Sequence, residues 1–378
     1  MRLGGGGEGH GHGKDNGRAE GNGRGEGNGR GKESGGGEGH GRWEGHGRGP
    51  AAVADRGRAD QPDGGLHVAF DGRPKPDQRG IGRYVRHLLA ALGRVAPGDL
   101  TETHRPRRAD VFHSPWIDGA LLRCPCPMVV TLHDLVPLKR RGEYLRTGIR
   151  FKLRYLAVQR AVRVIVPTEA VAADAEEHLA IHQDRIRVIP SAQAESLGPR
   201  PEGEVAAVRE RYGLPERYLL WVGGLEHPDP RKRIAELTKV PRHLPLVLVG
   251  QTGRWARELP DVTLTGHVPD DDLAAIYTGA HALTFPSDDE GFGLPTVEAL
   301  ACGTPVAACD VPALREVLGE RATFVARNDL PGLVAAAESA RRPAPAPPAW
   351  TWDDAARATW AVYEDAAGTC GPAVPRSV

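Results

Sequence analysis

Short apolar strands alternate with helices along this chain, and that alternation limits its fold more than any other feature. In the first half the expected strands are residues 66–71, 110–115, 128–132, 162–167 and 186–190. In the second half they are residues 218–224, 246–249, 262–265 and 281–285. Buried strands separated by helices form parallel sheets with helices on both faces. Because residues 190–215 hold scattered Pro and Gly between the two series, we expect two doubly wound α/β domains joined by a hinge.

The pattern divides the chain into three parts. Residues 66–195 are predicted to form an N-terminal Rossmann-like domain, and residues 196–378 a C-terminal one whose last helix, at 353–364, crosses back to the first domain. Residues 1–65 precede them as a tail that we expect to be disordered. The first 50 residues hold 22 of the chain's 49 glycines, with too few apolar side chains to offset the entropy of ordering. A solvated linker and an upstream sequence translated from a misassigned start codon both fit this composition.

Charge, cysteine content and hydropathy exclude several classes of protein. Lys+Arg and Asp+Glu both total 49, so nothing electrostatic favours a nucleic acid partner. The five cysteines lack paired metal-ligand spacing and are expected to be reduced thiols in the cytoplasm. No apolar run approaches the roughly 18 residues of a membrane-spanning helix, and no signal peptide is expected. A basic helix expected at residues 143–161 keeps peripheral contact with the inner face of a membrane as a minor alternative.

Two carboxylates eight positions apart bracket a glycine-rich turn and a helix start. Gly291 and Gly293 allow close approach of a ligand to the backbone, and a helix is predicted to begin near Leu294. The first N–H groups of that helix favour an anion such as a diphosphate. Glu290 and Glu298 are suited to accepting hydrogen bonds from sugar hydroxyls. The alternative is a capped surface helix with two solvated glutamates.

Two polar residues follow one of the expected buried strands. His133 and Asp134 follow the strand at 128–132, and the carboxyl end of a parallel strand is where such sheets bind ligands. We expect Asp134 to fix the tautomer of His133. A structural histidine is the alternative.

A basic turn follows the strand at 218–224. Arg231, Lys232 and Arg233 are expected at the start of a helix, where positive charge opposes the helix dipole unless an anion is bound. The sequence therefore predicts a diphosphate at this turn, with Lys232 as the first choice of cation and Arg231 as the second. A solvated basic helix start remains the alternative.

The segment from Glu290 to Val306 resembles the E-x7-E signature of the family 4 (group 1) glycosyltransferases, retaining enzymes with the two-domain GT-B fold. Further similarities extend from about Leu66 to about Ala366. Gly80-Ile81-Gly82-Arg83-Tyr84 is similar to the family's loop over the donor phosphates. The sequence departs from the family at Arg233, where Asn is common, and at 97–108, where relatives have more elements. That short stretch implies a trimmed N-terminal domain and puts the acceptor site in doubt.

The resemblance also implies roles for particular residues. Catalytic roles are implied for Glu290, His133, Lys232 and Arg231. Donor-binding roles are implied for Gly80, Gly82, Arg83, Gly224, Gly291, Phe292, Gly293, Leu294 and Glu298. In this scheme Glu298 holds the ribose. No cofactor and no metal are expected, because protein cations neutralise the phosphates and the Asp270-x-Asp272 pair is interpreted as a helix cap.

The implied function is transfer of a sugar from a nucleoside diphosphate-sugar donor to a hydroxyl of a carbohydrate or glycolipid acceptor. The reaction is expected to retain anomeric configuration, and the similarity favours a mannosyltransferase-like hexosyltransferase of surface polysaccharide or glycoconjugate synthesis. Two alternatives remain: a catalytically silent binding or scaffold protein with the GT-B fold, and a sugar-nucleotide epimerase with that fold. The sequence predicts neither the sugar nor the oligomeric state.

Overall fold

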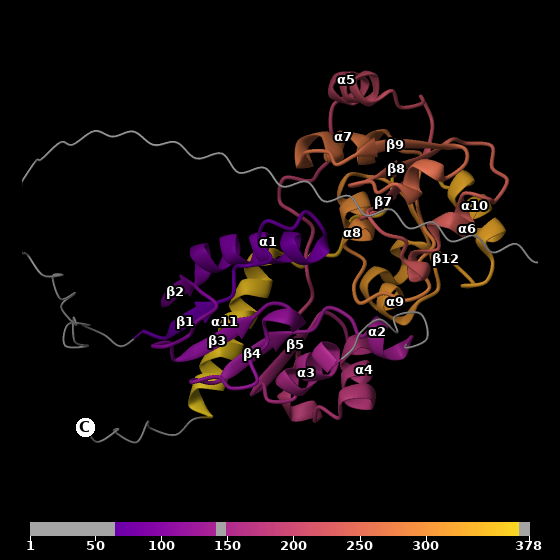
Figure 1. Ribbon diagram of the computed structural model, residues 1–378. Coiled ribbons are helices and arrows are strands. Elements are labelled where there is room, and N and C mark those ends of the chain that lie inside the picture. Colours follow the sequence, from indigo (N-terminus) through magenta and orange to yellow (C-terminus); the bar gives the residue numbers. More distant parts are fainter. Residues whose placement is uncertain (1–64, 141–148, 370–378) are drawn as a thin grey trace, which may run out of the picture. The chain divides into compact units, whose positions relative to one another are not determined.

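The computed structural model describes residues 65–140 and 149–369, which form two six-stranded parallel sheets (Figure 1). The first sheet has the order β2-β1-β3-β4-β5-β6 and the second β12-β11-β10-β7-β8-β9. The predicted fold class, two Rossmann-like domains, is confirmed. The expected tail lies outside the described residues, apart from Gly65.

The strands are short, and the central ones are buried. The first sheet contains β1 (His67–Phe70), β2 (Asp99–Glu102), β3 (Val111–Ser114), β4 (Met128–Thr131), β5 (Arg163–Val166) and β6 (Ile186–Val188). The second contains β7 (Leu219–Val222), β8 (Leu246–Val249), β9 (Val262–Gly266), β10 (Ala282–Phe285), β11 (Val306–Cys309) and β12 (Thr323–Val325). Strands β3, β4, β7, β8, β10 and β11 are buried along their whole length, as expected for parallel strands covered on both faces.

Helices cover both sheets. Those that follow the strands of the first sheet are α1 (Gly80–Val95), η1 (Ile117–Gly119), α2 (Val136–Lys139), α3 (Ile149–Val158), α4 (Glu169–Leu179) and η2 (Gln183–Arg185). Those around the second sheet are α5 (Glu202–Tyr212), η3 (Pro230–Lys232), α6 (Ile234–Leu237), η4 (Trp255–Glu258), α7 (Asp270–Gly279), α8 (Leu294–Ala301), α9 (Pro312–Leu318), η5 (Gly319–Arg321) and α10 (Leu330–Glu338). Within the described ranges, none of these helices has the length and apolar content needed to cross a bilayer.

The last helix, α11 (Trp352–Gly368), packs on the first sheet's domain, beside α1 (Figure 1). It begins with a capping box in which Thr351 and Asp354 exchange hydrogen bonds, an arrangement that satisfies the orphan N–H groups of a helix start. Trp352 lies edge-on to Tyr84 of α1, with ring centroids 5.7 Å apart. The helix therefore belongs by its packing to the N-terminal domain, although it follows the C-terminal one in sequence.

The structure departs from the sequence expectations in four places. Strands β11 and β12 were not predicted, because β11 is a short run with two alanines and β12 has only three residues, the first of them exposed. Strand β2 was not predicted, because its residues are polar and mostly exposed; it is an edge strand paired in parallel with β1. The hinge predicted at 190–215 contains the helix α5. Of the basic helix predicted at 143–161, the described part is α3, and its expected start lies outside the described residues.

A buried histidine links three elements of the N-terminal domain. His113 on β3 has no exposed surface; its Nδ1 lies 2.6 Å from the hydroxyl of Tyr363 and its Nε2 lies 2.9 Å from that of Thr131. Burial, together with the charge of His133, lowers its pKa to about 3. The folded chain therefore keeps His113 neutral at a pH where the unfolded chain protonates it.

This histidine predicts an acid-sensitive fold. Between an unfolded pKa near 6.5 and the folded value of about 3, stability should fall by about 1.4 kcal/mol for each pH unit. Urea unfolding at pH 7 and pH 5 measures the slope. In His113→Asn we expect a shallower slope, whatever the stability of the variant at pH 7. An unchanged slope would show that other groups cause the acid sensitivity.

Candidate functional site

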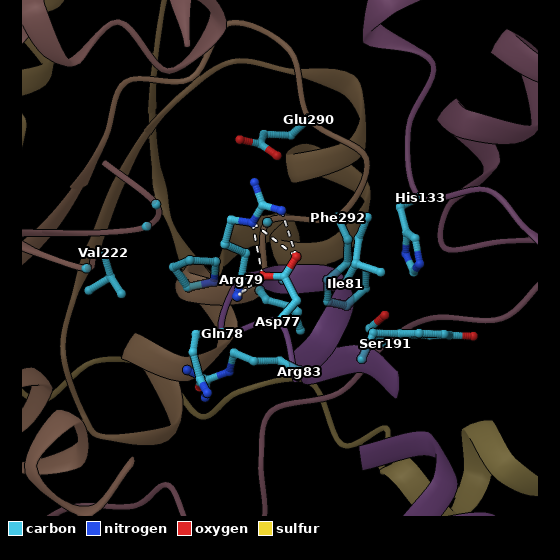
Figure 2. Close-up of a pocket in the computed structure, with 18 of the residues that line it drawn as sticks. Asp77, Gln78, Arg79, Ile81, Arg83, His133, Ser191, Val222, Glu290 and Phe292 are labelled. Carbon is cyan, nitrogen blue, oxygen red and sulfur yellow. Dashed lines mark hydrogen bonds and ion pairs between the residues drawn. The ribbon is translucent and has the colours of Figure 1, made fainter. Parts of the chain in front are cut away.

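A cavity of about 470 Å³ lies at the carboxyl ends of strands from both sheets (Figure 2). Its walls include His133, just beyond β4, and Glu290, beyond β10. This is the edge at which open α/β sheets bind ligands. The predicted site residues that line it are Gly80, Arg83, His133, Gly224, Arg231, Lys232, Glu290, Gly291, Phe292, Gly293 and Leu294.

Two residues predicted for the site do not line the cavity. Gly82 packs against backbone, since a Cβ there would lie 1.8 Å from the carbonyl oxygen of Asp77. Glu298 has only 4% of its side chain exposed and accepts a hydrogen bond of 2.9 Å from Tyr277. Its other oxygen lies 3.0 Å from Arg83 Nη2. Arg83, which does line the cavity, therefore stands between Glu298 and the space in which a ribose was expected.

The glycine-rich turn fits against the N-terminal domain. Gly293 has φ +82° and caps α8 from the left-handed region, which favours glycine. A Cβ on Gly291 would lie 1.8 Å from the carbonyl oxygen of His133. The hydroxyl of Thr168, at the start of α4, donates a 3.0 Å hydrogen bond to the Gly291 carbonyl. The loop that carries Glu290 is thus seated directly on two elements of the first domain.

We expect Gly291→Ala to disturb this seat. The added methyl group has to displace backbone, because its nearest neighbour is the His133 carbonyl rather than a flexible side chain. Overpacking of this kind costs about 2 kcal/mol. Thermal unfolding of Gly291→Ala and of Gly203→Ala, whose Cβ would meet nothing within 4 Å, measures the difference. Equal melting temperatures would show that the turn is not seated as described.

Arg231 is the centre of a charge cluster. Its side chain is 17% exposed; Nη1 lies 3.5 Å from Glu290 and 3.4 Å from Asp134, and Nε donates a 3.0 Å hydrogen bond to Asp229. Burial by itself lowers the pKa of Arg231, but the three carboxylates outweigh it and raise the pKa. Burial also raises the pKa of Glu290, against the opposing charges of Arg231 and Lys232. Arg231 therefore serves mainly to neutralise protein carboxylates.

Lys232 differs from its two basic neighbours. Within residues 65–140 and 149–369 it forms no ion pair, and its Nζ lies 5.7 Å from the centre of the Trp221 ring. Burial and the charge of Arg231 lower its pKa. Arg233 instead pairs with Glu236, at 2.7 Å. Lys232 is therefore a cation that lines the cavity and forms no ion pair with the described part of the chain.

The prediction that these cations start a helix holds only in part, because Arg233 is the N-cap of α6 while Arg231 and Lys232 precede it. Arg231 and Lys232 lie in the single turn η3, and Arg233, with φ +51°, separates it from the four-residue α6. The short turn arises because Asp229 caps Arg231 through its side chain and Arg233 adopts a left-handed conformation that ends the turn. Lys232 thus lies at the carboxyl end of the short turn η3, where a positive charge is not opposed by the dipole of that turn.

His133 is oriented by a backbone group. Its Nε2–H donates to the carbonyl oxygen of Pro115, at 2.9 Å, which leaves Nδ1 as an acceptor. The expectation that Asp134 fixes this tautomer is wrong, because Asp134 accepts a bond from the Val136 N–H and faces Arg231 instead. Burial lowers the pKa of His133, so the ring is neutral near pH 7.

The cavity also contains residues that the sequence did not single out. Arg79 and Asp77 form an ion pair of 2.7 Å at its mouth (Figure 2), and Gln251 and His267 line the wall near β8 and β9. No spacing or periodicity marks these side chains. Only their positions in the sequence could have pointed to them. Arg79 directly precedes Gly80, and Gln251 and His267 follow the ends of strands.

The aspartates at the start of α7 do not cap it. Pro269 occupies the cap position and makes no side-chain cap hydrogen bond. Asp270 lies 3.5 Å from Arg83, and Asp272 accepts hydrogen bonds from Arg211 and Tyr212. The described residues contain no cluster of three or more side chains suited to a metal ion.

Two Rossmann-like domains whose strands end at one cavity, with a glycine-rich helix start and a basic turn in its wall, define the GT-B class of fold. The family described as "Glycosyltransferase Family 4" matches residues 60–192, and the one described as "Glycosyl transferases group 1" matches residues 216–340. Together these matches cover more than half of the chain. The chain belongs to the group 1, family 4 glycosyltransferases.

Individual relatives agree with this assignment. The serotype-specific mannosyltransferase WbdA of Escherichia coli is 29% identical over 220 residues, 52% of this chain and 27% of the relative. The O-antigen chain mannosyltransferase B of Escherichia coli is 34% identical over 172 residues, 40% of this chain and 44% of the relative. The matches thus span less than half of either relative. A crystal structure of Anabaena HepE with UDP and glucose superposes with a TM-score of 0.58 at 14% identity, covering 81% of this chain and 97% of that one.

Proposed function

We propose that this chain transfers a hexosyl group from a nucleoside diphosphate-sugar to a hydroxyl of a carbohydrate or glycolipid acceptor. The observation that carries the proposal is Lys232, a cation in the cavity wall with no ion pair among the described residues. A partly buried charge is costly unless it is paired, and a ligand diphosphate would supply the missing anion. The N-terminus of α8 adds the Leu294 N–H and the positive end of the helix dipole at the same cavity.

The chemistry follows from where charge develops. When the bond between sugar and phosphate breaks, positive charge grows on the sugar and negative charge on the departing diphosphate. Lys232 and the Leu294 N–H at the start of α8 would stabilise the diphosphate, and the Glu290 carboxylate would lie near the sugar. His133, neutral and with Nδ1 as an acceptor, is suited to a sugar hydroxyl. We infer that these protein groups act without a metal and that anomeric configuration is retained.

The two Escherichia coli relatives carry mannosyltransferase names, and HepE was solved with UDP. These support a nucleotide-sugar donor and favour a mannosyl group in the synthesis of surface polysaccharide. GDP-mannose and UDP-glucose are therefore the first donors to test.

Thermal shift with a panel of GDP- and UDP-sugars, followed by release of nucleoside diphosphate, tests the proposal. We expect one donor to raise the melting temperature, since a ligand that binds only the folded state stabilises it, and to release its diphosphate when an acceptor is present. Binding without release would favour a silent binding protein. Conversion of the sugar with the nucleotide still attached would favour an epimerase. Neither binding nor release with any donor would contradict the proposal.

A further inference from the structure

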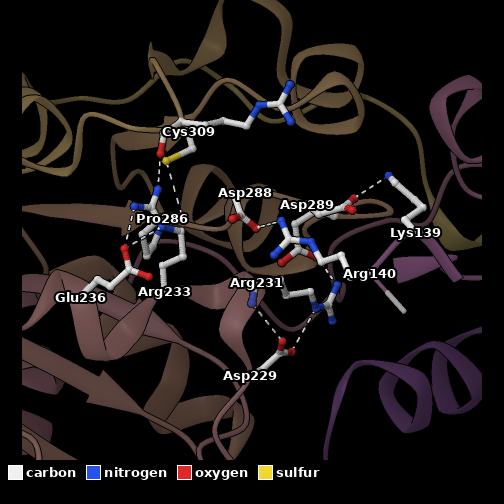
Figure 3. Close-up of polar contacts among 12 residues, drawn as sticks. Lys139, Arg140, Asp229, Arg231, Arg233, Glu236, Pro286, Asp288, Asp289 and Cys309 are labelled. Atoms are coloured by element: carbon white, nitrogen blue, oxygen red, sulfur yellow. Dashed lines mark hydrogen bonds and ion pairs between the residues drawn. The ribbon is translucent and has the colours of Figure 1, made fainter. Parts of the chain in front are cut away.

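Three carboxylates stand in succession in the loop after β10: Asp288, Asp289 and Glu290, of which Glu290 lines the cavity. Neighbouring like charges repel one another and repel an anionic ligand. In the structure each carboxylate faces a cation, and Figure 3 shows the pairs of Asp288 with Arg140 and of Asp289 with Lys139. Arg140 lies 2.5 Å from Asp288, Lys139 lies 3.0 Å from Asp289, and Arg231 lies 3.5 Å from Glu290.

Two of these cations come from the opposite domain. Lys139 ends α2 and Arg140 follows it, so both lie a few residues after His133, whereas the aspartates follow β10 of the second sheet. Lys139 is itself held by Asp174 of α4, at 3.0 Å. The pairs therefore fasten the Glu290 loop to the same segment that carries His133.

The backbone of this loop is held on its other side as well. The N–H of Asp288 donates a 3.0 Å hydrogen bond to the carbonyl of Arg231. Gly291 lies against the His133 carbonyl. Glu290 thus sits between two anchored neighbours, and its position depends on both domains.

The Arg140–Asp288 and Lys139–Asp289 ion pairs are partly shielded from solvent. Arg140 and Asp288 each have 22% of their side chains exposed, and Asp289 has 11%. Ion pairs at an open surface contribute little because water and salt screen them. Partial burial reduces that screening. Replacing either partner of a pair should therefore change the position of the loop that carries Glu290.

We propose that Lys139 and Arg140 are positioning residues that hold Glu290 in its working geometry through Asp289 and Asp288. The proposal rests on the proposed function for its kinetic consequence, but the geometry of the loop is separately measurable. A displacement of a few tenths of an ångström in a group that stabilises a transition state lowers the rate more than it lowers ligand affinity.

Two substitutions that change the charge in opposite directions distinguish a positioning role from a long-range electrostatic effect on the donor. Arg140→Asp adds negative charge near the diphosphate site, and Asp288→Arg adds positive charge. A field effect would make donor binding weaker in the first variant and tighter in the second. Positioning predicts that both variants lose about tenfold in kcat and that the exchanged pair, Arg140→Asp with Asp288→Arg, returns to within about threefold of wild type.

A matched control lies in the second domain. Arg315 and Asp310 form an ion pair of 2.6 Å, and neither lines the cavity. Exchanging their charges, singly and together, should leave kcat unchanged. Opposite signs of the Arg140→Asp and Asp288→Arg effects on kcat, or no recovery in the exchanged pair, would overturn the proposal.

Hydrogen–deuterium exchange of residues 286–293 in the full chain gives a readout that needs no activity. The amides should exchange faster in both single variants and regain protection in the exchanged pair. If wild type turns over no donor, the proposed function fails, while this pattern of exchange still supports the positioning role. Unchanged exchange in all variants would refute the positioning role even in an active enzyme.

Discussion

Replacing Glu290 by glutamine is expected to lower kcat by about 100- to 1,000-fold, the usual effect of removing one preorganised charge from a transition-state site. Glutamine has the shape of glutamate but not its charge. The binding of nucleoside diphosphate should change by less than about threefold, because Lys232 and the start of α8 are untouched. Steady-state kinetics for kcat and titration calorimetry for the diphosphate measure the two effects.

The size of this effect follows from the surroundings of the carboxylate. Only 12% of the Glu290 side chain is exposed, so its charge acts through little water. Burial raises its pKa, and activity should therefore fail on the acid side at a higher pH than an ordinary glutamate would allow. The fold should survive, since Arg231 keeps Asp134 and Asp229 as partners.

The control is Glu258→Gln, whose side chain is 70% exposed on η4 and outside the cavity. It should match wild type in both measurements. A Glu290→Gln enzyme with kcat within about threefold of wild type would remove Glu290 from the mechanism. A large loss of diphosphate binding would instead show that Glu290 orders the phosphate site.

Replacing Arg231 by methionine is expected to destabilise the fold by about 3 kcal/mol, because removing one partner of a buried ion pair leaves the others uncompensated. Methionine fills similar space. Three carboxylates, on Asp134, Asp229 and Glu290, would lose their shared cation. Urea unfolding of wild type and variant at pH 7 measures the loss.

The pH dependence of this loss has a definite sign. Burial already raises the pKa of Glu290 and the charge of Arg231 opposes that rise, so without Arg231 the folded variant binds more protons than the folded wild type. Its stability relative to wild type should improve as the pH falls from 7 to 5. The matched variant Arg315→Met, from a pair with 53% and 44% exposed side chains, should lose far less stability than Arg231→Met, because solvent screens that pair. A difference in unfolding free energy between wild type and Arg231→Met that is larger at pH 5 than at pH 7 would contradict the role given to Arg231 in the charge cluster.

Much of the fold was predictable because its strands carry their own signal. Apolar runs such as β4 and β10, ended by polar residues and followed by helices, indicate a parallel sheet without reference to any contact. Strand β2 was missed because its polar residues depend on pairing with β1. The local pattern of apolar residues does not predict an edge strand that is stabilised only by pairing with another strand.

The sequence predicted most of the residues that line the candidate site, but it did not predict which of them contact one another. Spacing placed Arg231 and Lys232 together, yet only the structure shows that Arg231 is engaged by Asp134, 97 positions earlier in the chain. Glu298 was expected to face the ligand because it lies one helical turn from the loop. Tyr277 and Arg83 hold it instead, and neither contact has a counterpart in sequence spacing.

The central claim is that this cavity holds a diphosphate against Lys232, and calorimetric titration of matched ligands tests it most directly. UDP and GDP are compared with uridine and guanosine, on wild type and on Lys232→Ala. We expect one diphosphate to bind wild type at least about tenfold more tightly than its nucleoside, and this advantage to shrink in Lys232→Ala while nucleoside affinity stays the same. Equal affinity of wild type for nucleoside and diphosphate, or no binding of either diphosphate, would contradict the claim.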